Sequence, residues 1–167
     1  MEDLIQVIVV SSAPREASEH DAVQLLNEAR KANRQNDVSG MMIYTTGCFL
    51  LALEGEAAKV DVACRMIFSG KRDMKAIFRE GIAEREFPEW TMGFETVEPL
   101  EAARLLGKPL GLETESGTAQ IEAESAKTLF SIIGRRRWQS DRSGMFRAIR
   151  RTNRAATPRA ATDAQKP

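Results

Sequence analysis

Side chains that commonly carry chemistry are few in this sequence and widely spaced. There is a single histidine, His20, which we expect on the surface, and the two cysteines, Cys48 and Cys64, lie sixteen positions apart. This set matches no zinc-ligand spacing and predicts no metal centre. Glu84 and Glu86 are close in sequence, but neither lies in the apolar surroundings that a catalytic pair of carboxylates needs. The sequence supports neither hydrolysis nor group transfer, and we expect a protein that is not an enzyme.

Phosphate-binding glycine loops are also missing from the sequence, which has neither G-x-x-x-x-G-K-[ST] nor G-x-G-x-x-G. The stretch GCFLLALEGE, residues 47–56, contains two glycines, and hairpin turns explain them better than a phosphate-binding loop does. At the period of a strand, Phe49, Leu51 and Leu53 share one face, and Leu50, Ala52 and Glu54 share the other. Such an apolar strand usually serves packing. The question it raises is whether Leu51 fills a core position or stands where a polar, functional residue would otherwise be.

The formal net charge of zero hides an asymmetry along the chain. Residues 1–134 carry fourteen basic and twenty-two acidic side chains, a net charge of −8, whereas residues 135–167 carry ten basic and two acidic ones, a net charge of +8. Such a division suggests an interaction tail or an intramolecular latch. The segment Arg135–Arg154 also contains large apolar residues, so it could form a basic amphipathic segment for an acidic partner, a nucleic acid or an acidic membrane surface. A solvated, partly disordered tail is the alternative interpretation.

The N-terminus has no basic region followed by a long apolar stretch, as a signal peptide would, and the longest apolar runs have the length of strands. We therefore expect a cytoplasmic protein with free thiols and no membrane span.

The periodicity of apolar residues predicts the elements that must position any site. A helix is expected over 22–33, with Ser18 as its cap, and a second one over 57–70. Strands are expected over 4–12, in two halves of a hairpin within 38–55, over 74–83 and over 90–97. The order is β-α-β-β-α-β-β, an α+β arrangement of the ferredoxin-like type.

In this fold both helices cover one face of the sheet. Since the hairpin strands are apolar on both sides, the other face needs a cover too, and we expect it from short helices over 99–107 and 119–134. The predicted organisation is a domain over 1–97, a helical cap over 98–134 and a basic, partly disordered tail over 135–167.

Three stretches carry a resemblance to a known family: NRQNDVSGMMIY (33–44), FLLALEGEAAKVDVACRMI (49–67) and GIAEREFPEWTMGF (81–94). In order and spacing, residues 3–97 resemble the BLUF domains, the flavin-based blue-light sensors. The resemblance implies that the isoalloxazine ring of FAD lies between the two helices. It also implies a tyrosine on the first strand and a glutamine on the third that face the ring and drive the light response.

Position by position, the resemblance gives a mixed set of site residues. Asn33 matches the asparagine that contacts the flavin, and Arg72 matches a basic residue near the phosphate side, although Asp73 beside it would repel a diphosphate. Trp90 and Met92 match the residues that pass the signal to the sheet.

The tyrosine and the glutamine, however, fall on Val9 and Leu51. Valine offers no proton or accessible oxidation, and leucine offers no hydrogen bond. The usual photocycle is therefore expected to be absent, and Leu51 stands where the family has its switching amide.

Three functional hypotheses remain open at this point. The first is a BLUF-type sensory or regulatory domain that acts through a protein partner, or as a homo-oligomer through the sheet face, without the usual photocycle. The second keeps a light response in which Trp90 or Cys48 reduces the excited flavin. The third is a flavin-free interaction module that uses its basic tail.

Overall fold

The structure, a computed structural model, describes residues 3–12, 19–45, 48–69, 74–111 and 121–142, with the side chains of 137–142 left aside. The chain divides into two compact units, Met1–Gly134 and Arg135–Pro167. The first unit holds a five-stranded sheet and its covering helices. Its elements are, in order, β1 (Leu4–Ser12), α1 (Glu19–Asn36), β2 (Ser39–Thr45), β3 (Cys48–Glu56), α2 (Ala57–Phe68), β4 (Met74–Gly81), β5 (Gly93–Thr96) and α3 (Pro99–Leu106), followed by the start of α4 (Ala123–Arg142).

The sheet has the strand order β4-β1-β3-β2-β5, in which β5 runs parallel to β2 and the other neighbours are antiparallel. The predicted order of elements and the α+β ferredoxin-like fold are thus confirmed. Some boundaries were wrong. The fifth strand begins at Gly93 rather than at residue 90, the fourth ends at Gly81 rather than at residue 83, and the last helix spans Ala123–Arg142 rather than 119–134. Trp90 and Met92 belong instead to an irregular segment, 82–92, which joins β4 to β5 and which we call the strap.

A close backbone approach explains the Ser39-Gly40 pair at the entry of β2. A Cβ atom added to Gly40 would lie 2.1 Å from the carbonyl oxygen of Ala52 on the neighbouring strand. Only glycine lets β2 pair with β3 at this point without displacing backbone.

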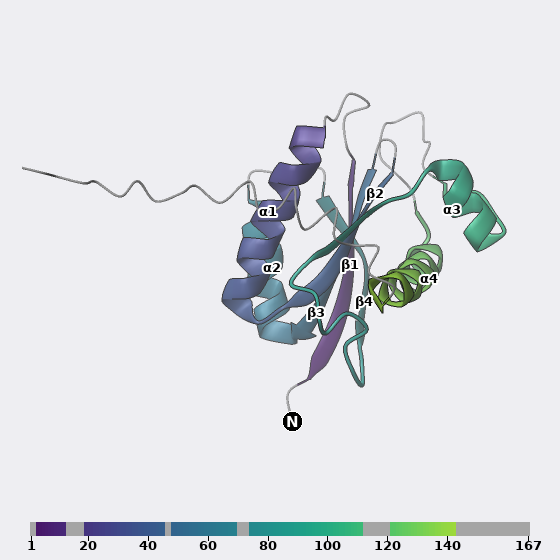
Figure 1. Ribbon diagram of the computed structural model, residues 1–167. Helices are drawn as coiled ribbons and strands as arrows, with labels where there is room; N and C mark the ends of the chain where they lie inside the picture. Colours follow the sequence, from purple (N-terminus) through teal and green to yellow (C-terminus); the bar gives the residue numbers. More distant parts are fainter. Residues whose placement is uncertain (1–2, 13–18, 46–47, 70–73, 112–120, 143–167) are drawn as a thin grey trace, which may run out of the picture. The chain divides into compact units, whose positions relative to one another are not determined.

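Both helices of the first part of the chain cover the same face of the sheet, which we call the helix side (Figure 1). The apolar stripe predicted for the first helix is buried there, as Ala22, Leu25, Leu26 and Ala29. This stripe packs against the side chains of β1 and β3 that point to the helix side. Helix α2 adds Val60, Ala63 and Ile67 to the same cluster. The period of 3.6 in the helices and of 2 in the strands accounts for this layer.

The opposite face of the sheet, which we call the cap side, is also buried. Its cluster combines Ile8, Met41, Ile43 and Leu50 of the sheet with residues of α3, of α4 and of the strap, namely Ala102, Leu129, Phe130, Ile133 and Phe87. The prediction that the region after residue 98 covers this face is therefore confirmed (Figure 1). The contribution of the strap was not foreseen.

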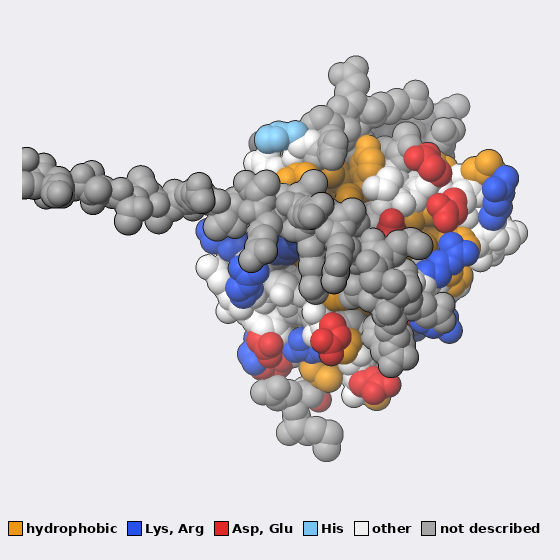
Figure 2. All heavy atoms as spheres, viewed as in Figure 1, with side chains coloured by type: hydrophobic (Ala, Val, Ile, Leu, Met, Phe, Trp, Pro, Cys, Tyr) orange, Lys and Arg blue, Asp and Glu red, His pale blue; other side chains and the backbone are white. Residues whose placement is uncertain are grey.

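Outside the core, His20 is exposed, as expected, and acidic and basic side chains are interspersed on the face shown in Figure 2. None of the described helices is both long and apolar enough to cross a membrane. The cytoplasmic location stays a prediction.

Candidate functional site

Val9 and Leu51, the positions at which the family resemblance implies a tyrosine and a glutamine, lie side by side at the centre of the sheet. The antiparallel register of β1 and β3 pairs them directly, and Met42 on β2 lies next to Leu51. All three are fully buried and belong to the apolar cluster under α1 and α2. Leu51 is thus a core residue, and the surface of both side chains is already covered by protein atoms.

Asn33 supplies a polar group near this apolar layer. Its side chain has no exposed surface, and its Nδ2 donates to the carbonyl oxygen of Thr91 at 2.7 Å. One turn earlier on α1, Arg30 Nε donates to the carbonyl oxygen of Met92 at 3.1 Å. The second half of α1 therefore holds the end of the strap. Asn33 Oδ1 is buried and has no hydrogen-bond partner among the described residues, which leaves an acceptor available to a ligand.

Trp90 and Met92 are close in sequence but belong to opposite sides of the sheet. Met92 is buried in the helix-side cluster. The Trp90 ring packs against the cap-side cluster and stacks on Phe87, with ring centroids 5.8 Å apart. The backbone between them is tied to β2, because Gly40 N donates to the carbonyl oxygen of Trp90 at 3.0 Å. The two residues thus join the two cores, whereas their role in signalling stays a prediction.

The alternative electron donors are not placed beside the helix-side layer. Cys48 is buried on the cap side, where burial raises the pKa of its thiol to about 12. Trp90 packs on the cap side as well. The hypothesis that either side chain faces a flavin between α1 and α2 therefore does not agree with the geometry. Arg72 and Asp73 lie outside the described residues.

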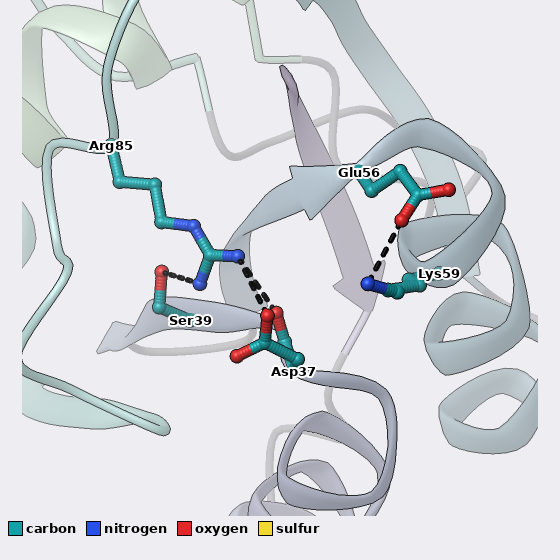
Figure 3. Close-up of polar contacts among 5 residues, drawn as sticks. All are labelled: Asp37, Ser39, Glu56, Lys59 and Arg85. Carbon is teal, nitrogen blue, oxygen red and sulfur yellow. Dashed lines mark hydrogen bonds and ion pairs between the residues drawn. The ribbon is translucent and has the colours of Figure 1, made fainter. Parts of the chain in front are cut away.

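Arg85 and Asp37 form a contact that sequence reasoning missed. α1 ends where Asp37 takes a left-handed conformation, with φ of 53°, and where Val38 N donates back to the carbonyl oxygen of Asn33 at 2.9 Å. Arg85 of the strap reaches this helix end: its Nη2 donates to the carbonyl oxygen of Asp37 at 2.8 Å (Figure 3). Arg85 Nη1 also lies 3.3 Å from the Ser39 hydroxyl, so the strap binds the junction of α1 and β2.

Glu54 is the second group that sequence reasoning left out of the site. This carboxylate is fully buried on the cap side; it accepts from Gln6 Nε2 at 2.7 Å and from the Phe87 backbone N at 2.9 Å. Burial raises the pKa of the Glu54 carboxyl, and these hydrogen bonds lower it by less. Burying an ion costs several kcal/mol, and a hydrogen bond to a charged group contributes about 1.5–3 kcal/mol, so the hydrogen bonds offset much of the cost of burial but not all of it. The sequence showed only the alternation along β3, which places Glu54 on the face of the sheet opposite to that of Leu51.

Phe87 joins the strap to the cap. Besides stacking on Trp90, it meets the Phe130 ring of α4 edge-on, with centroids 6.3 Å apart. A Cβ atom added to Gly134 would lie 2.6 Å from Phe87 Cε1. The strap is therefore fixed on one side to α1, through Asn33 and Arg30, and on the other side to the sheet and α4.

Of the three residues that the resemblance places around the flavin ring and that the structure describes, namely Asn33, Val9 and Leu51, only Asn33 offers the ring a hydrogen bond. The ring edge carries both hydrogen-bond donors and acceptors, and Asn33 Oδ1 can accept from a donor there. Val9 and Leu51 offer no hydrogen bond, and neither has exposed surface that a ring could contact without rearrangement. The site therefore does not match the photoactive arrangement, and no photochemical step can be derived from it.

Taken together, these observations define an α+β domain of the ferredoxin-like type, whose sheet is covered by α1 and α2 on one face and by α3, α4 and the strap on the other. The profile of the BLUF family, described as sensors of blue-light using FAD, matches residues 4–93, more than half of the chain. The chain belongs to the BLUF family.

Solved structures agree with this assignment. The BLUF protein BlrB in its dark state is 26% identical, with a TM-score of 0.53 over 64% of this chain and 81% of that protein. A bacterial light-regulated adenylyl cyclase is 25% identical, with a TM-score of 0.50 over 56% of this chain, and the match spans only 28% of the cyclase. Photo-activated BlsA, at 20% identity, shares the fold with a TM-score of 0.61 over 78% of this chain and 94% of that protein. No curated protein matches the chain.

Proposed function

We propose that this chain is a BLUF-family regulatory domain that acts through protein contact and does not run the usual photocycle of its family. The observation that carries the proposal is the Val9–Leu51 pair, which is directly paired across β1 and β3 and sealed in the helix-side core. A side chain that can neither give up a proton nor switch a hydrogen bond cannot respond to an excited flavin in the family's way.

FAD is the ligand that family membership suggests for the helix side. When bound, FAD would supply absorption of blue light. This chain's own contribution would be an acceptor at Asn33 Oδ1 and an apolar wall at Val9 and Leu51. Each polar group of the ring left unpaired against that wall costs about 1–3 kcal/mol, so we expect weaker binding than in a site with polar residues at both positions.

Absorption spectra of the purified full chain, dark and after blue light, test the proposal. We expect any flavin bands to show no reversible red shift. The double variant Val9→Tyr with Leu51→Gln is expected to bind more flavin and to gain the shift. The matched control is Val7→Tyr with Leu53→Gln, because this pair lies on the same face and is also directly paired across β1 and β3.

The control should bind no more flavin than the natural chain and should gain no shift. A reversible shift in the natural chain would overturn the proposal. A flavin-loaded double variant without any shift would show that more than two positions separate this site from a photosensor.

A second candidate function is binding of an acidic partner, a protein or a nucleic acid, through Arg135–Arg154. The observation in its favour is that the first compact unit ends at Gly134, where the basic part of the sequence begins. In this case the chain would be a flavin-free interaction module.

Affinity for a DNA duplex measured at several salt concentrations tests this function. Neutralised phosphates release counterions, so we expect affinity to fall steeply with salt. Changing Arg135, Arg136 and Arg137 to Gln should reduce that slope. The matched control, Arg79→Gln with Arg104→Gln and Lys108→Gln in the first unit, should leave the slope unchanged. Equal slopes for the two triple variants would argue against the tail as the binding segment.

A further inference from the structure

A row of polar residues crosses the otherwise apolar cap side of the sheet. Strand register places Glu80 of β4 beside Gln6 of β1, Gln6 beside Glu54 of β3, and Glu54 beside Ser39 of β2. Glu80 is exposed, whereas the other three are buried, and the Glu54 carboxylate lies in the middle of that buried part. We propose that the Gln6–Glu54 pair is a proton-operated latch that holds the strap, residues 82–92, on the sheet.

The latch has two states, and both leave the buried groups paired. In the ionised state, one Glu54 oxygen accepts from Gln6 Nε2 and the other from Phe87 N, as the distances of 2.7 and 2.9 Å indicate. When the carboxylate takes up a proton from water, the new O–H can donate to the Gln6 amide oxygen once that amide rotates, because glutamine carries both a donor and an acceptor. Phe87 N keeps its bond to the remaining oxygen. The net change is one proton bound and one negative charge removed.

The charged groups around Glu54 do not neutralise it. Glu86 on the strap adds a negative charge nearby, which opposes ionisation of Glu54. Arg85, also on the strap, directs its guanidinium to Asp37 and Ser39 at the far end of the row. On the other end, Lys127 of α4 lies 3.8 Å from Glu80. The donors that contact the carboxylate directly are neutral: they are the Gln6 amide and the backbone N–H groups of Phe87 and Glu86.

Proton uptake and closure of the strap are linked because both involve the Glu54 carboxyl group, which binds the proton and also accepts from Phe87 N of the strap. If the strap leaves the sheet, Glu54 loses Phe87 N and meets water, where its charge is well solvated. Closure therefore favours the protonated form, and protonation favours closure by the same amount. Lowering the pH tightens the strap, and raising the pH through the titration of Glu54 loosens it. Since the strap carries the backbone contacts to α1 and the Phe87 contact to α4, loosening reaches both sides of the sheet.

This latch lies on the face opposite Val9 and Leu51 and does not depend on flavin. The test uses the full chain with Trp138→Phe, which leaves Trp90, stacked on Phe87, as its only tryptophan. We expect Trp90 fluorescence to titrate with a midpoint above 4.5, the ordinary pKa of the carboxyl. With Glu54→Gln added, which keeps the shape and a neutral amide, the titration should disappear.

Two further variants distinguish the effect of the Gln6–Glu54 pair on the titration from the effect of a nearby charge. Gln6→Leu removes the donor that supports the ionised form, so the midpoint should move to higher pH. Glu86→Gln is the matched control on the strap itself, and it should keep the titration with a midpoint moved slightly to lower pH.

A titration that persists when Glu54→Gln is added, or a Trp138→Phe chain whose Trp90 signal is flat from pH 4.5 to 8 while it stays folded, would overturn the proposal. If Glu54→Gln does not fold, the carboxyl carbon of Glu54 in the natural chain, followed by ¹³C NMR, decides. A midpoint at or below 4.5 would then refute the latch.

Discussion

The two faces of the sheet treat polar groups in opposite ways. On the helix side, the positions where the family resemblance implies a tyrosine and a glutamine hold Val9 and Leu51, and this layer is closed by apolar contacts. On the cap side, a carboxylate remains in the core, at Glu54, and both of its oxygens have donors. Asn33, at the edge of the helix side, keeps one acceptor that no other described residue contacts by a hydrogen bond.

The difference shows what allows a polar group to stay buried in this domain. Glu54 is retained where neighbouring strands and the strap supply donors at hydrogen-bond distance. A tyrosine and a glutamine at positions 9 and 51 would need a polar ligand to do the same. On the helix side, Val9 and Leu51 have no polar group to satisfy, whereas on the cap side Glu54 keeps its hydrogen bonds to Gln6 and Phe87.

The largest effect is expected from changes at Leu51. Leu51→Ala removes buried methyl groups without access to solvent and should lower the free energy of unfolding by about 2–5 kcal/mol. Leu51→Gln places an amide in the same apolar layer and should cost about 1–3 kcal/mol. Chemical denaturation of the two variants, with and without added FAD, measures both.

The comparison between the two Leu51 variants is the informative part. FAD should restore stability to Leu51→Gln more than to Leu51→Ala, because only the amide can bond to the ring. Equal effects of FAD on both would show that the ring does not reach position 51.

On the cap side, Gly134→Ala should lower stability by about 1–3 kcal/mol, since the added methyl group overlaps Phe87 at 2.6 Å. Thr128→Ala, an exposed change on the same helix, is the control and should stay within about 0.5 kcal/mol of the natural chain. Thermal unfolding of both variants provides the measurement. If Gly134→Ala matches Thr128→Ala, the strap and α4 are not in the tight contact described here.

Much of the fold was predictable because it follows local patterns. The alternation in β3 placed Leu51 and Glu54 on opposite faces, and two-sided apolar strands required a cover from the later helices. The strap was not predictable in the same way. The residues from Trp90 to Met92 have the composition of a strand, yet hydrogen bonds from the Gly40 backbone N and the Arg30 side chain hold them in an irregular path. Burial of Glu54 depends on donors 48 and 33 positions away, and a glutamate is rarely expected inside.

A smaller effect is expected for Asn33→Ala in the flavin-free protein. The variant loses the hydrogen bond to Thr91, worth about 1 kcal/mol, but it also removes an unpaired buried acceptor, whose presence is itself unfavourable. The two contributions oppose each other, so we expect a change of about 1 kcal/mol or less in denaturant unfolding. Flavin affinity, measured by fluorescence titration, should fall more than this stability does. An unchanged affinity would mean that Oδ1 does not contact the ligand.

The smallest change at any single pH is expected for Glu54→Gln, and it concerns the pH dependence of stability. The pKa of Glu54 is raised in the folded chain, so its contribution to stability is fully present below the unfolded pKa, about 4.5, and is lost as the pH rises through the folded pKa. The glutamine variant has no such loss. The difference in unfolding free energy between the natural chain and the variant should therefore favour the variant increasingly from pH 4 upward and level off once Glu54 is ionised. A difference that is constant over this range would show that Glu54 titrates alike in both states, and the contrast between the two faces would then reduce to packing alone.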